Sequence, residues 1–261
     1  MKQTIYIVDA FTERLFGGNP AAVCILESWL DDNLMQNIAA ENNLSETAFT
    51  VKNNDSYEIR WFTPALEVDL CGHATLATAH VLFNYFNHPA DTIDFISPHS
   101  GRLTVQKTGD LLTLYFPTDI PSEVEVGEGL VAALGKPPIM TMRGKTDYLL
   151  VYGSQHDIQT LNPDIQKLAR AEGRGVIVTA KGDEVDFVSR FFAPQSGIDE
   201  DPVTGSAHTV LTPYWSKELG KTRLTAQQVS KRKGDLICEF HGERVKISGK
   251  AVTYLIGEIQ I

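Results

Sequence analysis

The sequence predicts an α+β fold built from two similar lobes, and three observations carry this prediction. Of the 261 residues, 43% are hydrophobic, enough for one large core or two modest ones. Turns as short as residues 53–55 separate neighbouring strand patterns, which favours hairpins over the long crossovers of a parallel sheet. An aromatic motif also recurs half a chain apart.

The elements of the first half follow from hydrophobic spacing and turn residues. A helix is expected where Leu30, Leu34 and Ile38 recur at helical spacing, ending near Asn42. The other expected elements are strands at 6–8, 21–26, 47–51 and 57–62, a small-residue helix at 74–86, two strands flanking the turn at 109–110, and a short helix at 130–134. In the second half, Pro213 predicts a kink or a fresh start in the helix after Ser206.

The repeat is the most informative pattern. The run RWFTP at 60–64 returns as RFFAP at 190–194, an offset of 190 − 60 = 130, and a hairpin pattern precedes each copy. After a two-residue gap, Thr78-Ala79-His80 aligns with Ser206-Ala207-His208. We therefore expect one lobe at 1–116, joined by a last strand at about 250–261, and a second lobe at 117–249. A pseudo-twofold axis would place equivalent loop-to-helix junctions across a cleft.

Composition excludes several classes of function. Lys+Arg 23 against Asp+Glu 33 gives a net charge of −10, so nucleic acid is a poor partner. No apolar run approaches the ~18 residues of a membrane span, and the first residues form a strand pattern rather than a signal peptide. Three cysteines at unpaired spacing indicate neither a disulfide framework nor a zinc site. We expect a cytoplasmic protein.

Two loop-to-helix junctions, residues 70–75 and 199–207, are the candidate binding elements. Each leads into a helix through glycine and small residues, so free backbone N–H groups and the positive helix end could hold a carboxylate. Singly, Gly72 and Gly205 could merely permit tight turns while Asp201 and Ser206 cap helices. The repetition of the pattern favours the functional interpretation.

Glu46 stands at the entry to a strand, where glutamate is depleted, and its half-chain counterpart near position 176 is a valine. A single carboxylate suits an acid/base that takes and returns a proton on one face of a substrate. His73 could share a proton with Glu46 or Asp201. Cys71 as a nucleophile lacks a nameable orienting group, and His80 and His208 lie within helix patterns as packed residues.

Six fragments, in order, resemble the phenazine-biosynthesis PhzF-like family along essentially the whole chain: VDAFT (8–12), GNP (18–20), LSETAF (44–49), FTP (62–64), LCGHAT (70–75) and EDPVTGSA (200–207). The resemblance implies the diaminopimelate epimerase fold, with two pseudo-symmetric lobes that each wrap a mixed sheet around a central helix. It also implies a homodimer that needs no metal or organic cofactor.

By the same resemblance, Glu46 is the general acid/base, and Gly72, His73, Asp201, Gly205 and Ser206 bind and polarise the substrate. Asn19, in the GNP fragment, is expected among the substrate-binding residues. The related epimerases use a cysteine at each junction, whereas this chain has Asp201 opposite Cys71, so the two-thiol mechanism should not operate.

The expected activity is cofactor-independent isomerisation, in which Glu46 moves a proton on a small cyclic or amino carboxylate. One alternative is an amino-acid epimerase that uses Cys71 and Asp201 as its opposed pair. Another is a non-catalytic binder of small carboxylates. The sequence leaves open the substrate, a part for Cys71 in proton transfer, and the roles of Gln228 and Arg232.

Overall fold

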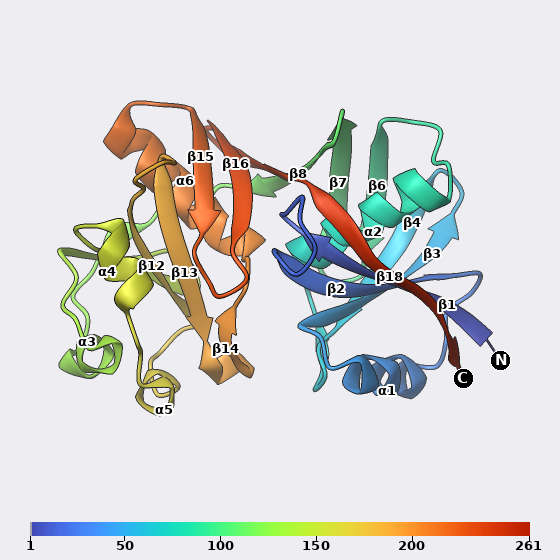
Figure 1. Ribbon diagram of the computed structural model, residues 1–261, viewed down its shortest axis with the longest axis horizontal. Helices are drawn as coiled ribbons and strands as arrows, with labels where there is room; N and C mark the ends of the chain where they lie inside the picture. Colours follow the sequence, from blue (N-terminus) through green and yellow to red (C-terminus); the bar gives the residue numbers. More distant parts are fainter. Residues whose placement is uncertain (1) are drawn as a thin grey trace. The chain divides into compact units, whose positions relative to one another are not determined.

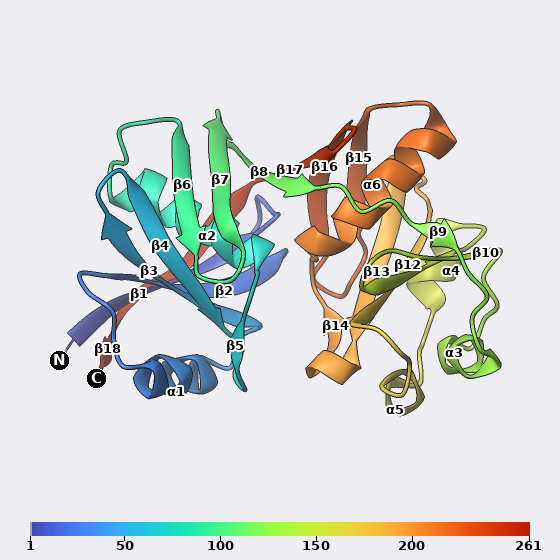
Figure 2. The same cartoon turned by 180° about the vertical axis from the view of Figure 1, so that it is seen from behind.

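Strands dominate both halves of the chain, and short helices separate them (Figures 1 and 2). The computed structural model describes residues 2–261. The chain divides into two units, one made of residues 2–115 and 248–261 and the other of Phe116–Ile247. Each unit combines strands in parallel and antiparallel pairs with few helices, so the predicted α+β class is confirmed.

The first unit contains the following elements: β1 (Lys2–Ala10), β2 (Asn19–Leu26), α1 (Asp32–Asn42), β3 (Glu46–Asn53), β4 (Ser56–Phe62), β5 (Glu67–Val68), α2 (Gly72–Tyr85), β6 (Thr92–Ser97), β7 (Gly101–Thr108), most of β8 (Leu111–Pro117) and β18 (Ala251–Gln260). Hydrophobic spacing placed α1, the β3–β4 hairpin and α2 correctly, with ends shifted by a few residues. The sequence analysis missed β6, which follows a run of turn residues.

The second unit contains β9 (Ser122–Glu123), α3 (Glu128–Leu134), β10 (Met140–Arg143), β11 (Asp147–Val151), α4 (Gln155–Thr160), α5 (Ile165–Leu168), β12 (Gly175–Lys181), β13 (Phe187–Ala193), a 3₁₀ turn (Pro194–Ser196), β14 (Ile198–Asp201), α6 (Gly205–Leu219), β15 (Arg223–Gln228), β16 (Gly234–His241) and most of β17 (Arg244–Gly249).

The two units repeat one topology. In the first, β2 pairs in parallel with β3, β3 forms a hairpin with β4, β4 pairs in parallel with β6, and β6 forms a hairpin with β7. In the second, β11, β12, β13, β15 and β16 make the same four pairings in the same order. The aromatic motif that recurs at 60–64 and 190–194 therefore marks the same position in two copies of one supersecondary unit.

Strand register fixes which residues correspond. Thr47 lies opposite Phe62, and Val176 lies opposite Phe192, so Glu46 corresponds to Gly175. Helices α2 and α6 begin at Gly72 and Gly205, so His73 corresponds to Ser206. The alignment of Thr78 with Ser206 is wrong, because Thr78 is the seventh residue of α2 and Ser206 the second of α6. Both helices are rich in small residues, so sequence similarity alone had aligned them five positions away from the alignment of their starts.

A buried helix lies at the centre of each unit, as the implied fold requires. Helix α2 packs against β1, β2, β3, β7 and β18, and α6 packs against β11, β15 and β16. Pro213 sits inside α6 without interrupting it. Proline cannot donate to the carbonyl four residues earlier, and the Thr209 carbonyl instead accepts a hydrogen bond from the Asp119 amide at 3.2 Å. The expected fresh start is therefore wrong.

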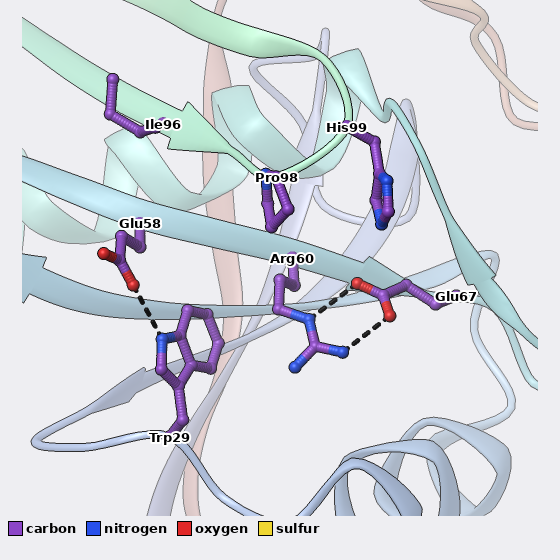
Figure 3. A pocket seen from close by; sticks show the side chains of 7 residues that line it. All are labelled: Trp29, Glu58, Arg60, Glu67, Ile96, Pro98 and His99. Atoms are coloured by element: carbon purple, nitrogen blue, oxygen red, sulfur yellow. Dashed lines mark hydrogen bonds and ion pairs between the residues drawn. The ribbon is translucent and has the colours of Figure 1, made fainter.

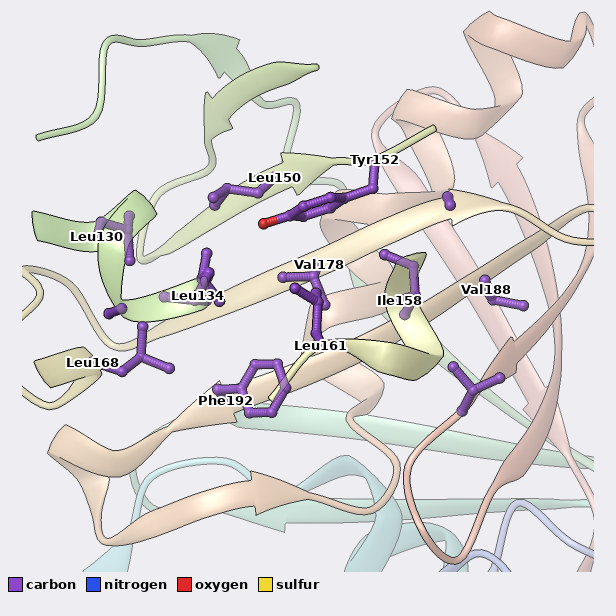
Figure 4. Close-up of a cluster of buried hydrophobic side chains, with 14 residues drawn as sticks. Leu130, Leu134, Leu150, Tyr152, Ile158, Leu161, Leu168, Val178, Val188 and Phe192 are labelled. Carbon is purple, nitrogen blue, oxygen red and sulfur yellow. The ribbon is translucent and has the colours of Figure 1, made fainter. Parts of the chain in front are cut away.

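A hydrophobic cluster under the β12–β13 hairpin anchors the second unit (Figure 4). Leu134 of α3, Ile158 of α4 and Leu168 of α5 pack with Val178 and Phe192 from the two strands. Because all five side chains are buried, the cluster fixes where β12 begins, and with it the residue just before that strand.

Candidate functional site

Glu46 is the first residue of β3 and pairs with Ala21 of the parallel strand β2. Only 8% of the residue is exposed, so its carboxylate lies in a poorly hydrated environment. Its Oε2 atom is 3.3 Å from Nε2 of His73. A general acid/base needs such a dry position together with a polar neighbour.

His73 is the second residue of α2 and is 5% exposed. The amide nitrogen of Asn19 lies 3.2 Å from its Nδ1, and Sγ of Cys71 lies 3.4 Å from the same atom. An amide nitrogen only donates, so Nδ1 accepts and the ring proton sits on Nε2, on the Glu46 side. Burial lowers the pKa of His73 to about 3, so the imidazole is neutral at pH 7. Asn19, His73 and Glu46 thus form a chain of contacts.

The GNP turn places Asn19 at the start of this chain. Gly18 has a φ of +59°, and a Cβ there would lie 2.1 Å from the Ala10 carbonyl oxygen. Only glycine fits this backbone position. Asn19 follows as the first residue of β2 and is fully buried. Its side chain therefore contacts His73 from a buried position.

The start of α2 supplies further hydrogen-bond donors. Cys71 is the N-cap in an extended conformation, makes no side-chain capping bond, and the first turn carries no acidic residue. The first amides of a helix, here from Gly72 onward, have no intrahelical acceptor, and the helix dipole favours negative charge beside them. The residues predicted for this half of the site therefore come together: Asn19, Glu46, Gly72 and His73.

Three of these groups could be considered as metal ligands. One ligand atom each from Glu46, Cys71 and His73 lie within 4.8 Å of one another. However, Cys71 faces Nδ1 of the imidazole while Glu46 faces Nε2. An ion bound at one ring nitrogen would point away from the ligand on the opposite edge. The geometry fits a chain of polar contacts through the imidazole better than a metal cage.

The second unit gathers the remaining predicted residues around the start of α6. Asp201 ends β14, and its Oδ2 accepts a 2.5 Å hydrogen bond from the Thr204 hydroxyl. Gln228 is fully buried and holds both ends of this loop: its Oε1 accepts from the Thr204 amide at 2.8 Å, and its Nε2 donates to the Asp201 carbonyl at 2.7 Å. The sequence left the role of Gln228 open. In the structure it stabilises the DPVTGS loop (201–206) by bonding two of its backbone groups.

Helix register changes the expected partner of Cys71. Cys71 is the N-cap of α2, and Thr204 is the N-cap of α6. Thr204, rather than Asp201, therefore stands at the position equivalent to Cys71.

Sequence reasoning missed one charged group beside Ser206. Arg174 donates from Nη2 to Ser206 Oγ at 2.9 Å and from Nε to Asp147 Oδ1 at 2.9 Å, and Nη2 also contacts Asp147 Oδ2. The only signal in the sequence was the position of Arg174 directly before Gly175, the counterpart of Glu46. That signal needs the strand register, which the sequence does not provide.

The two units, each built around a buried helix, have the epimerase fold. A hydroxyproline epimerase of Agrobacterium vitis, solved with trans-4-hydroxy-L-proline, matches 99% of this chain and 92% of its own at a TM-score of 0.61 and 10% identity, which shows the fold alone. The family model for phenazine biosynthesis-like proteins matches residues 8–257, and the chain belongs to that family.

Two close relatives agree with this assignment. An uncharacterized isomerase of Pseudomonas aeruginosa is 53% identical over 262 residues, covering all of both chains. The crystal structure of a PhzF-family phenazine biosynthesis protein from Enterococcus faecalis matches all of both chains at a TM-score of 0.97 and 50% identity. The family and fold expected from the sequence are therefore confirmed. No helix within residues 2–261 is long and apolar enough to cross a membrane.

Proposed function

We propose that this protein is an isomerase that moves a proton on a small carboxylate, with Glu46 as the single general acid/base. The contact between Glu46 and the neutral, tautomer-fixed His73 carries the proposal. A neutral imidazole can donate to the carboxylate without cancelling its charge. The 3.3 Å separation is loose, and substrate binding can tighten such contacts.

In the proposed step, the Glu46 carboxylate takes a proton from an activated carbon of the substrate. The electron pair of that C–H bond shifts the double bond along the conjugated system. The protonated Glu46 then returns a proton to a different carbon, which regenerates the carboxylate. No net oxidation or reduction occurs, so the chain's own side chains suffice for the step.

The remaining site residues are proposed to bind and orient the substrate. The helix-start amides at Gly72 and Gly205 and the Ser206 hydroxyl suit a carboxylate group, and Asp201 suits an amine or hydroxyl. The expected homodimer and the cytoplasmic location are further predictions. Light scattering of the purified protein and fractionation of the producing cells test them.

A deuterium wash-in experiment tests the proposal. Wild type and Glu46→Gln are incubated in heavy water with a panel of small cyclic and amino carboxylates, and mass and product isomers are read together. Glu27→Gln, an exposed glutamate of the same unit, is the matched control. We expect exchange in wild type and in the control and its loss in Glu46→Gln. Exchange that survives in Glu46→Gln contradicts the role of Glu46. Binding without any exchange favours the non-catalytic binder.

A further inference from the structure

In the second unit, Ser206 occupies the place that His73 occupies in the first, and Arg174 lies one residue before the place of Glu46. Glu46 corresponds to Gly175, the residue after Arg174, and His73 corresponds to Ser206. In both units a charged side chain contacts the second residue of the central helix: Glu46, the first residue of β3, lies 3.3 Å from His73, and Arg174, just before β12, lies 2.9 Å from Ser206. The charge is negative in one unit and positive in the other.

Packing around Gly175 explains why the second unit has no carboxylate at the position equivalent to Glu46. A Cβ at Gly175 would lie 2.3 Å from Cζ of Phe191, so the aromatic ring fills the space of any side chain there. The guanidinium of Arg174 lies over that same ring, 5.3 Å from its centre. The ring therefore both excludes a second acid/base and supports the arginine.

Comparison with two other arginines shows what is unusual about Arg174. Arg60 and Arg190 each bind one carboxylate through Nε and Nη2, as Figure 3 shows for Arg60 and Glu67. Each also uses Nη1: Arg60 donates to Asp32, and Arg190 to two backbone carbonyls. Arg174 has the same two-point contact with a carboxylate, but no acceptor for its Nη1 is found within residues 2–261. Protein groups therefore hold the Arg174 guanidinium through Nε and Nη2 only, which leaves its Nη1 side open.

The surroundings of that open side suit an anion. The Arg174 side chain is 40% exposed, whereas the Asp147 side chain that orients it is 2% exposed. The Ser206 hydroxyl accepts from Arg174, which leaves its own hydrogen to donate elsewhere. The N-cap of α6 makes no side-chain capping bond, and the first turn contains no acidic residue. A planar fork, a hydroxyl donor and a helix start are complementary to a carboxylate.

We infer that Arg174 and Ser206 form a binding site for the carboxylate group of the substrate, with Asp147 as the residue that positions the arginine. The inference rests on the proposed function for its assignment to the substrate. It requires only that the second unit select a carboxylate over a neutral group of the same shape.

Calorimetric titration of the full-length protein tests this assignment. The probes are benzoate and proline, each compared with its carboxamide. The variants are Ser206→Ala and the double variant Arg174→Met/Asp147→Asn, which avoids leaving Asp147 buried without its partner. Arg170→Met, which removes an exposed positive charge from the same unit, is the control. Thermal melting confirms that each variant is folded.

We expect wild type and Arg170→Met to bind at least one carboxylate about 10- to 100-fold more tightly than its carboxamide, as charge-assisted hydrogen bonds allow. Ser206→Ala should reduce this preference, and the double variant should abolish it. Equal binding of acid and amide by wild type, or a preference that survives in the double variant, overturns the assignment. Glu46→Gln separates the two proposals: it should keep the carboxylate preference while losing exchange.

Discussion

The amide nitrogen of Asn19 lies 3.2 Å from Nδ1 of His73, between residues 54 positions apart in the chain. This contact determines which edge of the imidazole carries its proton, and Glu46 lies on the protonated edge. Asn19 is fully buried against this histidine, so we predict that it influences Glu46 by fixing the imidazole tautomer.

Replacing Asn19 with alanine should therefore disturb chemistry more than binding. Nδ1 would keep only the weak Cys71 thiol as a donor, and the imidazole would populate both tautomers. We expect kcat to fall by about 10- to 100-fold with a smaller change in KM, because the wrong tautomer turns a lone pair toward Glu46. Nitrogen-15 NMR of His73 reports the tautomer directly. Asn33→Ala, in an exposed part of α1, is the control; an unchanged His73 spectrum in Asn19→Ala contradicts the prediction.

Stability should fall as pH decreases from 6.5 to 5 because buried histidines cannot take up protons. Burial lowers the pKa of His208 to about 4, although its contact with the Thr204 carbonyl partly opposes the shift. The folded pKa lies below the unfolded value of about 6.5, so the unfolded state binds the proton first. Each such histidine lowers the unfolding free energy by about 1 kcal/mol per pH unit, averaged over this range.

Urea denaturation at pH 6.5 and pH 5 measures that slope. His208→Gln keeps a donor for the Thr204 carbonyl and does not titrate, so its slope should be shallower by about 1 kcal/mol per pH unit. Identical slopes in wild type and His208→Gln would mean that His208 is protonated in the folded protein.

Gln228→Leu should release the DPVTGS loop. The substitution leaves the Thr204 amide and the Asp201 carbonyl without their side-chain partner in a buried place. We expect a loss of about 2–6 kcal/mol in unfolding free energy, from two groups at about 1–3 kcal/mol each, together with weaker carboxylate binding. The neighbouring Gln227→Leu removes only a contact to Asp235 and should change neither quantity measurably. Chemical denaturation and calorimetry distinguish the two variants.

Gly18→Ala should destabilise the fold more than Gly109→Ala, although both glycines have φ near +60°. The added Cβ meets nothing within 4 Å at Gly109, so that substitution costs only the backbone term of about 1 kcal/mol. At Gly18 the same atom meets the Ala10 carbonyl and must shift the strand that presents Asn19. Thermal melting compares the two variants, and equal melting temperatures would show that the GNP turn relaxes freely.

Local sequence patterns were sufficient to predict many of the helices and strands of this protein. The spacing that predicted α1, the turn residues that predicted the β3–β4 hairpin, and the Gly-rich starts of α2 and α6 act over a few residues, so the sequence expresses them directly. The repeated aromatic motif went further and indicated a duplicated unit, which the strand pairings show. The family resemblance supplied Glu46 and His73, and the structure brings these two together.

Tertiary structure alone decided the register of the repeat. Small residues recur throughout both central helices, so sequence similarity could match Ser206 with Thr78, whereas the helix starts match it with His73. The Asn19–His73 contact, the hydrogen bonds of Gln228 to Thr204 and the Arg174–Ser206 contact all depend on residues 24 to 54 positions apart meeting in space. Local spacing carries no record of such contacts, because they arise only when strand pairing and core packing fix which side chains face one another.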